Sequence, residues 1–347
     1  MTILLSSEVA EEIEEAILLA RAATQTEQIV VHAPAAVLEK ARISHHFGLT
    51  IVPVKAFSYR ARVLPKLSGL AEFIALVLRT RPRVIMSGFS MMKHRVMSRV
   101  LRIPHVSYIR GLMFNPDTKL GISDKLRYGV FRGRNVRVLN AFEASHVLTV
   151  AQINEDFMVA RGVDRERIHQ VGPVWLRDVP PARATQDSGR VFFVTKAFEA
   201  HGVDEAHRRQ TETIRQLAAS FPGQLCIRAH PRDFYAYEED AALRDVSVAR
   251  STPREFLLSL TQADILISPL STMAFEALHV GARVVFFTAE GVTDDLTKAY
   301  RALGITPHPL DDLASAVQRA RAGEATHVKV FSAIDETVAA QVLVGAS

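Results

Sequence analysis

The sequence predicts an α/β protein built from two doubly wound domains, each with a parallel sheet. The strongest evidence is residues 263–287, where a buried strand, a short polar turn, a helix and a second buried strand follow one another within 25 residues. Apolar strands this continuous, separated by a helix, are typical of a parallel βαβ unit covered on both faces. The same alternation of strand and helix patterns recurs through both halves of the chain, so we expect one such sheet in each half.

The amino-terminal half predicts six strands, with helices between most of them. Each predicted strand is a short apolar run, and the segments between strands repeat apolar residues at helical spacing. Residues 111–140 break this pattern with four glycines, a proline and several basic and aromatic side chains, which predicts an irregular or partly helical functional loop. Strands are expected at residues 3–6, 29–32, 50–54, 83–86, 105–109 and 146–150, and helices at 9–23, 35–47, 67–80 and 91–101.

The carboxyl-terminal half begins after a proline-rich polar stretch and repeats the pattern. We expect an amino-terminal domain over residues 1–175, a linker over 176–189, a second domain over 190–325 and a final helix within 326–347 that crosses back to the first domain. Besides residues 263–287, strands are expected at 191–195, 225–229 and 246–249, and helices at 205–220, 235–243, 252–262, 310–321 and 334–344.

Composition limits the class of protein. With 48% hydrophobic and 23% charged residues in 347, the chain is expected to be a soluble globular protein large enough for two domains. The single cysteine, Cys226, excludes a disulfide framework and a cysteine-built metal site, and it favours a reducing compartment. The amino terminus lacks the basic segment of a signal peptide, so a cytoplasmic location is expected.

Charge is unevenly distributed along the chain. Residues 40–137 hold 20 Lys+Arg and only three Asp+Glu, a net charge of +17. A field this strong concentrates anions, so we expect the amino-terminal half to meet an acidic polymer or an anionic phospholipid surface. A solvated basic face without a specific partner is the alternative. Nucleic acid is disfavoured, because no zinc-ligand spacing and no aromatic RNA-binding signature accompany the charge.

Polar side chains follow neighbouring strands of the second predicted sheet. Arg228 and His230 end the strand at 225–229, and Ser271 and Thr272 come between the strand and the helix of the 263–287 unit. In parallel sheets these positions meet at the carboxyl edge, where doubly wound folds bind ligands. Hydroxyls, an imidazole and a helix amino terminus all donate to phosphate oxygens, so a nucleotide phosphate site is predicted. Helix capping by Ser271 or Thr272, and a backbone-bonded His230, are the structural alternatives.

Two further groups are predicted at the same edge. Thr195 and Lys196 end the first strand of the second domain and are candidates for phosphate contacts. No Asp-x-Asp metal motif is present, so we expect no metal and no cofactor beyond the nucleotide-linked co-substrate.

The motifs RAHPRD (228–233) and SPLSTMAFEAL (268–278) resemble the donor domain of GT-B-fold glycosyltransferases. The resemblance covers residues 145–290 and is greatest to bacterial sialyltransferases, polysialyltransferase-like capsule enzymes and 3-deoxy-manno-octulosonic acid (Kdo) transferases. Teichoic-acid glycerophosphotransferases show a related pattern. The resemblance implies two Rossmann-like domains facing a cleft. It also implies that His230, Ser271 and Thr272 hold the phosphate of a cytidine-nucleotide donor, and that Glu276 accepts its ribose hydroxyls.

The catalytic base does not carry over from this family, because its acidic D/E-D/E-G motif has no clear counterpart in the first domain. A transferase needs a general base for the acceptor hydroxyl. Candidates on predicted loops and strand ends of the first domain are Asp117, His94 and His32.

The function expected from these features is metal-independent transfer of an acidic sugar, such as Kdo or sialic acid, from a CMP donor. The expected acceptor is a bacterial surface polysaccharide or lipopolysaccharide, with peripheral contact at an anionic membrane. The alternatives are a UDP-sugar-dependent transferase, a CDP-glycerol-type glycerophosphotransferase, a UDP-N-acetylglucosamine epimerase, and a non-catalytic GT-B-like module that binds glycan or membrane. The residues expected to meet the acceptor or membrane are Arg110, Lys125, Arg127, Arg132 and Arg134.

Overall fold

In the computed structural model the chain folds into two compact units. The amino-terminal unit comprises Met1–Arg177 and Phe331–Ser347, and the carboxyl-terminal unit comprises Asp178–Val330. The structure describes residues 2–7, 10–23, 28–40, 49–54, 63–88, 92–112, 143–185, 189–196, 198, 204–230, 233–288, 299–324, 326 and 328–345.

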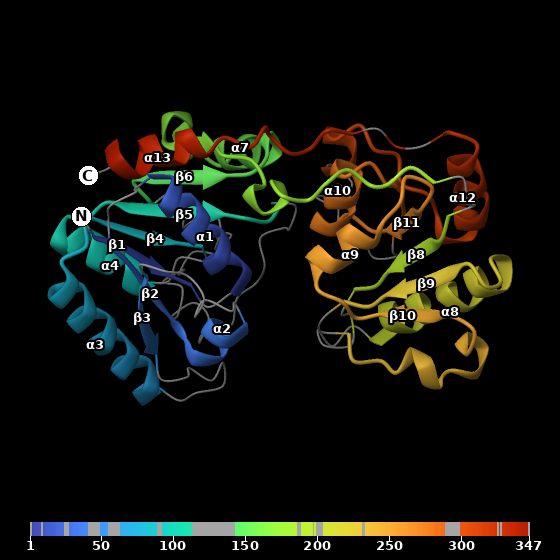
Figure 1. The fold of residues 1–347 in the computed structure, drawn as a ribbon, viewed down its shortest axis with the longest axis horizontal. Coiled ribbons are helices and arrows are strands. Elements are labelled where there is room, and N and C mark those ends of the chain that lie inside the picture. Colours follow the sequence, from blue (N-terminus) through green and yellow to red (C-terminus); the bar gives the residue numbers. More distant parts are fainter. Residues whose placement is uncertain are drawn as a thin grey trace. The chain divides into compact units, whose positions relative to one another are not determined.

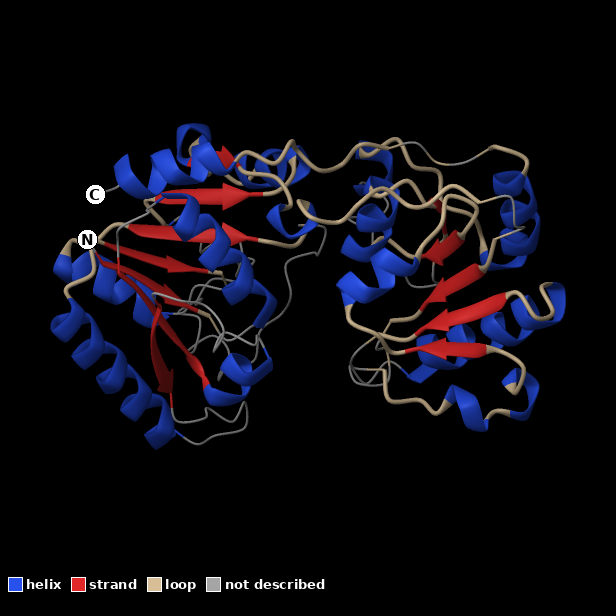
Figure 2. Ribbon diagram, viewed as in Figure 1, coloured by secondary structure: helices blue, strands red, loops and turns tan. Residues whose placement is uncertain are grey.

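The amino-terminal unit is a seven-stranded parallel sheet of order β3-β2-β1-β4-β5-β6-β7, with helices on both faces (Figures 1 and 2). Along the chain run β1 (Thr2–Ser6), α1 (Ala10–Ala23), β2 (Gln28–Pro34), α2 (Ala35–Lys40), β3 (Leu49–Val54), α3 (Val63–Thr80), β4 (Val84–Ser87), α4 (Met92–Leu101), β5 (His105–Ile109), β6 (His146–Thr149), α7 (Gln152–Val159) and β7 (Ile168–Gln170). The short 3₁₀ turns η2 (Arg165–Arg167) and η3 (Val174–Leu176) and the final helix α13 (Glu336–Gly345) complete it.

Alternation along the strands sends every second side chain of this sheet toward α3 and α4. Leu4 pairs in register with Val30 and Ile85, and all three pack against Phe73 of α3 and Met97 of α4. The final helix α13 packs against α1 in the same unit.

The carboxyl-terminal unit has a five-stranded parallel sheet of order β10-β9-β8-β11-β12. Its aliphatic and aromatic core includes Phe193, Ile227 and Ile267 from three adjacent strands. Its elements are β8 (Val191–Val194), α8 (Asp204–Ser220), β9 (Leu225–Arg228), η5 (Tyr237–Glu239), η6 (Ala241–Leu243), β10 (Ser247–Ala249), α9 (Pro253–Ser259), β11 (Ile265–Ser268), α10 (Thr272–His279), β12 (Arg283–Phe286), η7 (Leu310–Asp312) and α12 (Leu313–Arg321).

The predicted fold class, two doubly wound parallel-sheet domains, is confirmed. The helix predicted at 235–243 is wrong, because this stretch forms two 3₁₀ turns that meet at Asp240. Its carboxylate accepts the amide hydrogen of Ala242 and so starts a new turn there. The short strand β7 was not predicted, because three residues are too few for a recognisable alternation pattern. The eight-residue helix α7 was not predicted either.

Candidate phosphate-binding site

The candidate site lies where the winding direction of the carboxyl-terminal sheet reverses. From β8 the chain proceeds to β9 and β10 on one side, and then to β11 and β12 on the other. Ligands of open parallel sheets bind at the carboxyl ends of strands beside such a switch point. Thr195 and Lys196 follow β8, Ser271 and Thr272 follow β11, and His230 follows β9. Three adjacent strands therefore end in predicted site residues.

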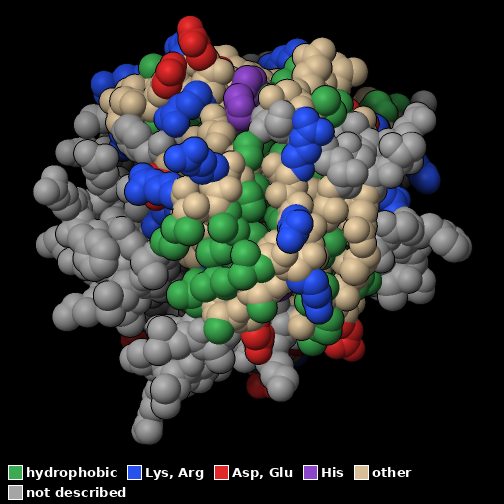
Figure 3. Space-filling model, turned by 90° about the vertical axis from the view of Figure 1, so that its left-hand side faces the viewer, with side chains coloured by type: hydrophobic (Ala, Val, Ile, Leu, Met, Phe, Trp, Pro, Cys, Tyr) green, Lys and Arg blue, Asp and Glu red, His purple; other side chains and the backbone are tan. Residues whose placement is uncertain are grey.

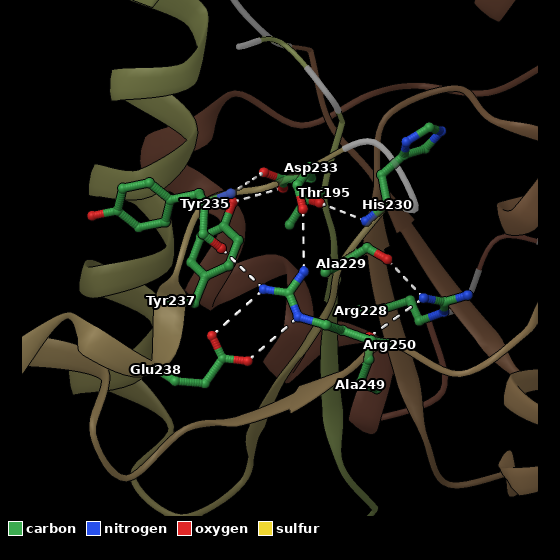
Figure 4. Close-up of polar contacts among 10 residues, drawn as sticks. All are labelled: Thr195, Arg228, Ala229, His230, Asp233, Tyr235, Tyr237, Glu238, Ala249 and Arg250. Carbon is green, nitrogen blue, oxygen red and sulfur yellow. Dashed lines mark hydrogen bonds and ion pairs between the residues drawn. The ribbon is translucent and has the colours of Figure 1, made fainter. Parts of the chain in front are cut away.

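His230 is held by its backbone, and its side chain is exposed. The His230 amide donates to the Thr195 hydroxyl at 3.0 Å, and the Asp233 amide donates to the His230 carbonyl at 2.8 Å. The imidazole points away from the other side chains drawn in Figure 4. The turn is thus fixed while the imidazole is accessible to a ligand. Thr195 is buried and supports this turn.

A buried polar network lies beneath the turn (Figure 4). The Tyr237 hydroxyl donates to Asp233 Oδ2 at 2.9 Å. It also accepts from Gln210 Nε2 at 3.3 Å. Burial, and then the neighbouring Asp233 carboxylate, raise the pKa of Tyr237, so its hydroxyl stays a donor. The Gln210 amide also accepts from the Lys196 backbone amide at 2.8 Å and donates to its carbonyl at 3.2 Å. The Gln210 side chain therefore joins the end of β8 to Tyr237 of η5.

Sequence reasoning missed Gln210 and Tyr237. Gln210 lies at helical spacing from Ile214 and Leu217, two core residues of α8. A polar side chain on the buried face of a predicted helix is a signal that could have identified it. Arg250, which donates to the carbonyls of Asp233 and Tyr235, gave no such signal.

Arg228 is buried, and its guanidinium is committed to the backbone. It donates to the carbonyls of Ala229 at 2.7 Å and Ser251 at 2.6 Å, and it lies 5.2 Å from the ring centroid of Phe256. Burial lowers the pKa of Arg228, and it makes no ion pair within the described residues. These contacts hold the ends of β9 and β10, so direct phosphate contact by Arg228 stays a prediction. Its charge still adds positive potential beside His230.

Ser271 is the N-cap of α10. Its hydroxyl accepts from the Ala274 amide at 3.2 Å and lies 3.0 Å from the Ser268 hydroxyl. Thr272, the first helical residue, is half-buried, and its hydroxyl makes no hydrogen bond to the described part of the chain. Glu276, one turn further along α10, is buried. Thr272 is therefore better placed than Ser271 to donate to a ligand.

Tyr300 fixes the backbone of the turn before α10. Its hydroxyl accepts from the Leu270 amide at 2.8 Å and donates to the Phe287 carbonyl at 2.9 Å. Burial raises the pKa of Tyr300, which keeps the hydroxyl protonated. The amides at the start of α10 consequently have a defined position for an anion.

Lys196 follows β8 directly, with its backbone held by Gln210. Its side chain is half-buried, and burial lowers its pKa below the usual range. It has no carboxylate partner among the described residues. A half-buried ammonium group without an anion is costly, and a bound phosphate would supply one.

The amino-terminal unit places His94 and His32 inside its core. His94 Nε2 and His32 Nδ1 lie 2.9 Å and 3.1 Å from the Ser6 hydroxyl, and both rings pack on Phe73. Burial, reinforced by Lys93, lowers the pKa of His32 to about 3 and that of His94 well below its usual range. A neutral, buried imidazole of such low basicity is a poor acceptor of a substrate proton. The catalytic role predicted for His94 remains untested, and its burial argues against it.

Glu12 of α1 is a carboxylate that the sequence patterns do not predict as a site residue. The Ser7 hydroxyl donates to Glu12 Oε2 at 2.6 Å, and a Cβ atom added at Gly88 would lie 2.0 Å from the same oxygen. Glu12 therefore lies directly against the glycine that follows β4. β1 and β4 are neighbours at the switch point of the amino-terminal sheet, so this carboxylate occupies a typical ligand position.

Arg110, predicted to face an anionic acceptor, instead pairs inside the unit. Its Nε lies 2.5 Å from Glu15 Oε1, and its guanidinium carbon lies 4.8 Å from the ring centroid of Trp175. The predicted residues Asp117, Lys125, Arg127, Arg132 and Arg134 lie outside the described residues.

The described residues contain neither a candidate metal cluster nor a candidate membrane-spanning helix. No cluster of three or more His, Cys, Asp or Glu side chains in the described ranges could hold a metal ion. No helix in the same ranges is long and apolar enough to cross a membrane.

The comparisons with known proteins identify the fold. No protein-family model matches the sequence, and no curated protein matches it significantly. UDP-GlcNAc 2-epimerase from Methanocaldococcus jannaschii has a TM-score of 0.63 at 12% identity, over 99% of this chain and 98% of that chain. The enzyme from Neisseria meningitidis, bound to UDP-GlcNAc, has a TM-score of 0.62 at 11% identity, over 100% and 99%. MurG from Acinetobacter baumannii has a TM-score of 0.53 at 10% identity, over 99% and 94%. Both units therefore have the Rossmann-like topology of the GT-B fold.

Proposed function

We propose that the protein is a nucleotide-sugar-dependent glycosyltransferase whose donor is a UDP-linked sugar. The observation that carries the proposal is Lys196, a half-buried ammonium group without a carboxylate partner in the described residues, at the switch point of the carboxyl-terminal sheet. Solved structures of similar fold include a UDP-GlcNAc 2-epimerase bound to UDP-GlcNAc and UDP, which favours uridine as the base.

In the proposed transfer reaction, this site must stabilise the diphosphate that leaves the sugar. Cleavage of the sugar–phosphate bond leaves negative charge on phosphate oxygens, and preorganised donors lower the barrier to that charge. Lys196 supplies a cation, Thr272 a hydroxyl, and the first amides of α10 a helix terminus. The exposed imidazole of His230 supplies a further donor. All four belong to one sheet edge of one unit.

Transfer also requires a base that removes the proton of the acceptor hydroxyl. We assign this step to Glu12, whose carboxylate is oriented by Ser7 and lies against Gly88. The acceptor is proposed to be an anionic surface polysaccharide or lipopolysaccharide, because residues 40–137 carry a net charge of +17. The substitution Glu12→Gln should reduce turnover strongly while leaving the affinity for the nucleotide unchanged.

A CMP-linked acidic sugar, such as Kdo or sialic acid, is the second candidate donor. The observation that favours it is the pair of motifs at His230–Pro231 and Ser271–Thr272, which resemble those of cytidine-nucleotide-dependent transferases. A monophosphate leaving group needs fewer contacts than a diphosphate, and the same residues could provide them.

A thermal-shift panel with UDP, CMP, CDP and GDP tests the proposal. We expect the largest stabilisation with UDP, and loss of that stabilisation in Lys196→Met but not in Lys329→Met, which removes an exposed lysine of the same unit. A larger thermal shift with CMP than with UDP would indicate a cytidine-linked donor instead of a uridine-linked one. Stabilisation by none of the four would reject a nucleotide site and favour a non-catalytic module. Incubation with UDP-GlcNAc alone separates the epimerase, which needs no acceptor, from the transferase.

A further inference from the structure

The outer surface formed by α3 and α4 exposes large apolar side chains. Leu78 is 55% exposed, Val96 is 42% exposed and Val100 is 69% exposed. Ile74, Leu101 and Ile103, which are only partly buried, pack against the core between the same two helices. Figure 3, which looks onto this side of the amino-terminal unit, shows hydrophobic side chains gathered beside lysines and arginines. Exposed aliphatic groups of this size on neighbouring helices are typical of an interaction surface.

Exposed charge on this surface is mostly positive, although Glu72 of α3 is exposed and Glu143 pairs with Arg95 of α4. Residues 73–112, which span the second half of α3, all of α4 and the turns after them, contain eight Lys+Arg and no Asp or Glu. Two of the eight, Arg95 and Arg110, pair with Glu143 and Glu15. Arg81, Arg83, Arg99 and Arg102 are all exposed. Arg99 makes only a long contact of 3.8 Å to Glu143. A second copy of this surface would meet the same excess of positive charge, so an anionic occupant is favoured.

Two of these arginines are in a backbone conformation that glycine adopts more easily. Arg81 follows α3 with φ of 43°, and Arg102 follows α4 with φ of 54°. A left-handed conformation costs a non-glycine residue roughly 1 kcal/mol, and glycine is the usual residue at the end of a helix. Arg81 precedes β4 and Arg102 precedes β5. Because these strands are parallel neighbours, both arginines lie at the amino-terminal ends of the strands. The fold thus has two neighbouring cationic residues at positions where glycine would make the folded state more stable.

We propose that this surface docks on an anionic phospholipid bilayer. Leu78, Val96 and Val100 would enter the headgroup region, while the arginines pair with lipid phosphates and carboxylates. The combination favours lipid over nucleic acid, because exposed aliphatic side chains gain from an acyl boundary, and no exposed aromatic residue for base stacking accompanies them among the described residues of α3 and α4. The proposal is independent of the identity of the nucleotide.

Vesicle cosedimentation of the full chain tests this docking. We expect binding to phosphatidylcholine vesicles with about 30% phosphatidylglycerol, weak binding to pure phosphatidylcholine, and release when NaCl is raised from about 0.1 M to about 0.5 M. Leu78→Gln should weaken binding several-fold. Leu258→Gln, at a 44% exposed leucine of the carboxyl-terminal unit, should not.

The decisive variant is Arg81→Gly/Arg102→Gly. It removes two cations and also relieves the left-handed strain, so the fold should be as stable as the wild type or more stable. Each arginine near an anionic surface contributes about fivefold to binding, so vesicle affinity should fall roughly 25-fold. Arg244→Gln/Arg301→Gln removes the same charge from exposed positions of the other unit and should have little effect.

Three results would overturn the proposal. The first is wild-type binding that is absent or equal on neutral and anionic vesicles. The second is equal vesicle affinity of the double-glycine variant and the wild type. The third is binding to duplex RNA or an acidic polypeptide without binding to anionic vesicles, which would make another macromolecule the partner.

Discussion

Lowering the pH from about 7.5 to about 5.5 should destabilise the amino-terminal unit through three buried histidines. His32, His94 and His105 are almost completely inaccessible to solvent, and the Ser87 hydroxyl lies 2.8 Å from His105 Nε2. Burial lowers the pKa of His32 and of His105 to about 3, and lowers that of His94 well below 6.5. The folded unit therefore stays unprotonated at these positions while the unfolded chain binds protons below its own pKa near 6.5.

The sign and size of the effect follow from this difference. Stability contributed by a neutral buried histidine is present above pH 6.5 and falls as the pH drops from there toward the folded value. As the pH falls from about 7.5 to about 5.5, each histidine lowers the folding equilibrium constant roughly tenfold. The three together lower the free energy of unfolding by about 4 kcal/mol. His105→Asn should remove about one third of this dependence.

Urea unfolding followed by tryptophan fluorescence is the appropriate assay. Trp175 is the only tryptophan of the chain and lies in the amino-terminal unit beside Arg110, so its emission reports the unfolding of that unit. Unfolding free energies that stay level across this pH range would refute the burial argument. Such a result would also reopen a catalytic role for His94.

Three further substitutions and one change of pH probe the proposed site and its support. Lys196→Met should weaken UDP binding by about 10- to 150-fold in calorimetry, since a charged hydrogen bond contributes roughly 1.5 to 3 kcal/mol; an affinity equal to that of Lys329→Met would contradict the assignment. In the wild type, UDP affinity should fall as the pH rises through a Lys196 pKa that lies below the usual range. Gly88→Ala should displace the Glu12 carboxylate and slow turnover without weakening UDP binding, and unchanged steady-state kinetics would argue against Glu12 as the base. Tyr237→Phe removes a donor to the buried Asp233 and should cost about 1 to 3 kcal/mol in calorimetric unfolding, whereas an unchanged transition would show that Asp233 does not need it.

Hydrophobic patterning was sufficient to predict every strand of the two described sheets except β7. Continuous apolar runs at β8, β9 and β11 identified parallel strands, and the residues that follow them were correctly placed at one sheet edge. The helix predicted around Tyr237 was wrong because apolar residues at helical spacing also fit two consecutive 3₁₀ turns. The Asp240 carboxylate caps the second turn and so favours the two turns over one helix.

Side-chain roles were less predictable, because they depend on which partner lies nearest in three dimensions. Nothing in the sequence around His94 distinguishes a loop histidine from one bonded to Ser6, 88 residues away. Arg110 belongs by sequence to a basic stretch, yet Glu15 of α1 neutralises it. Glu12 was overlooked because it lies in an acidic helix, and its position against Gly88 appears only once β1 and β4 are paired.

The central claim is that the carboxyl edge of the second sheet holds the phosphates of a nucleotide. A crystal structure of the protein with UDP tests it most directly. We expect the diphosphate within hydrogen-bond distance of Lys196 Nζ and the Thr272 hydroxyl, at the amino terminus of α10. A diphosphate bound elsewhere, with Lys196 unaltered and unpaired, would contradict the account.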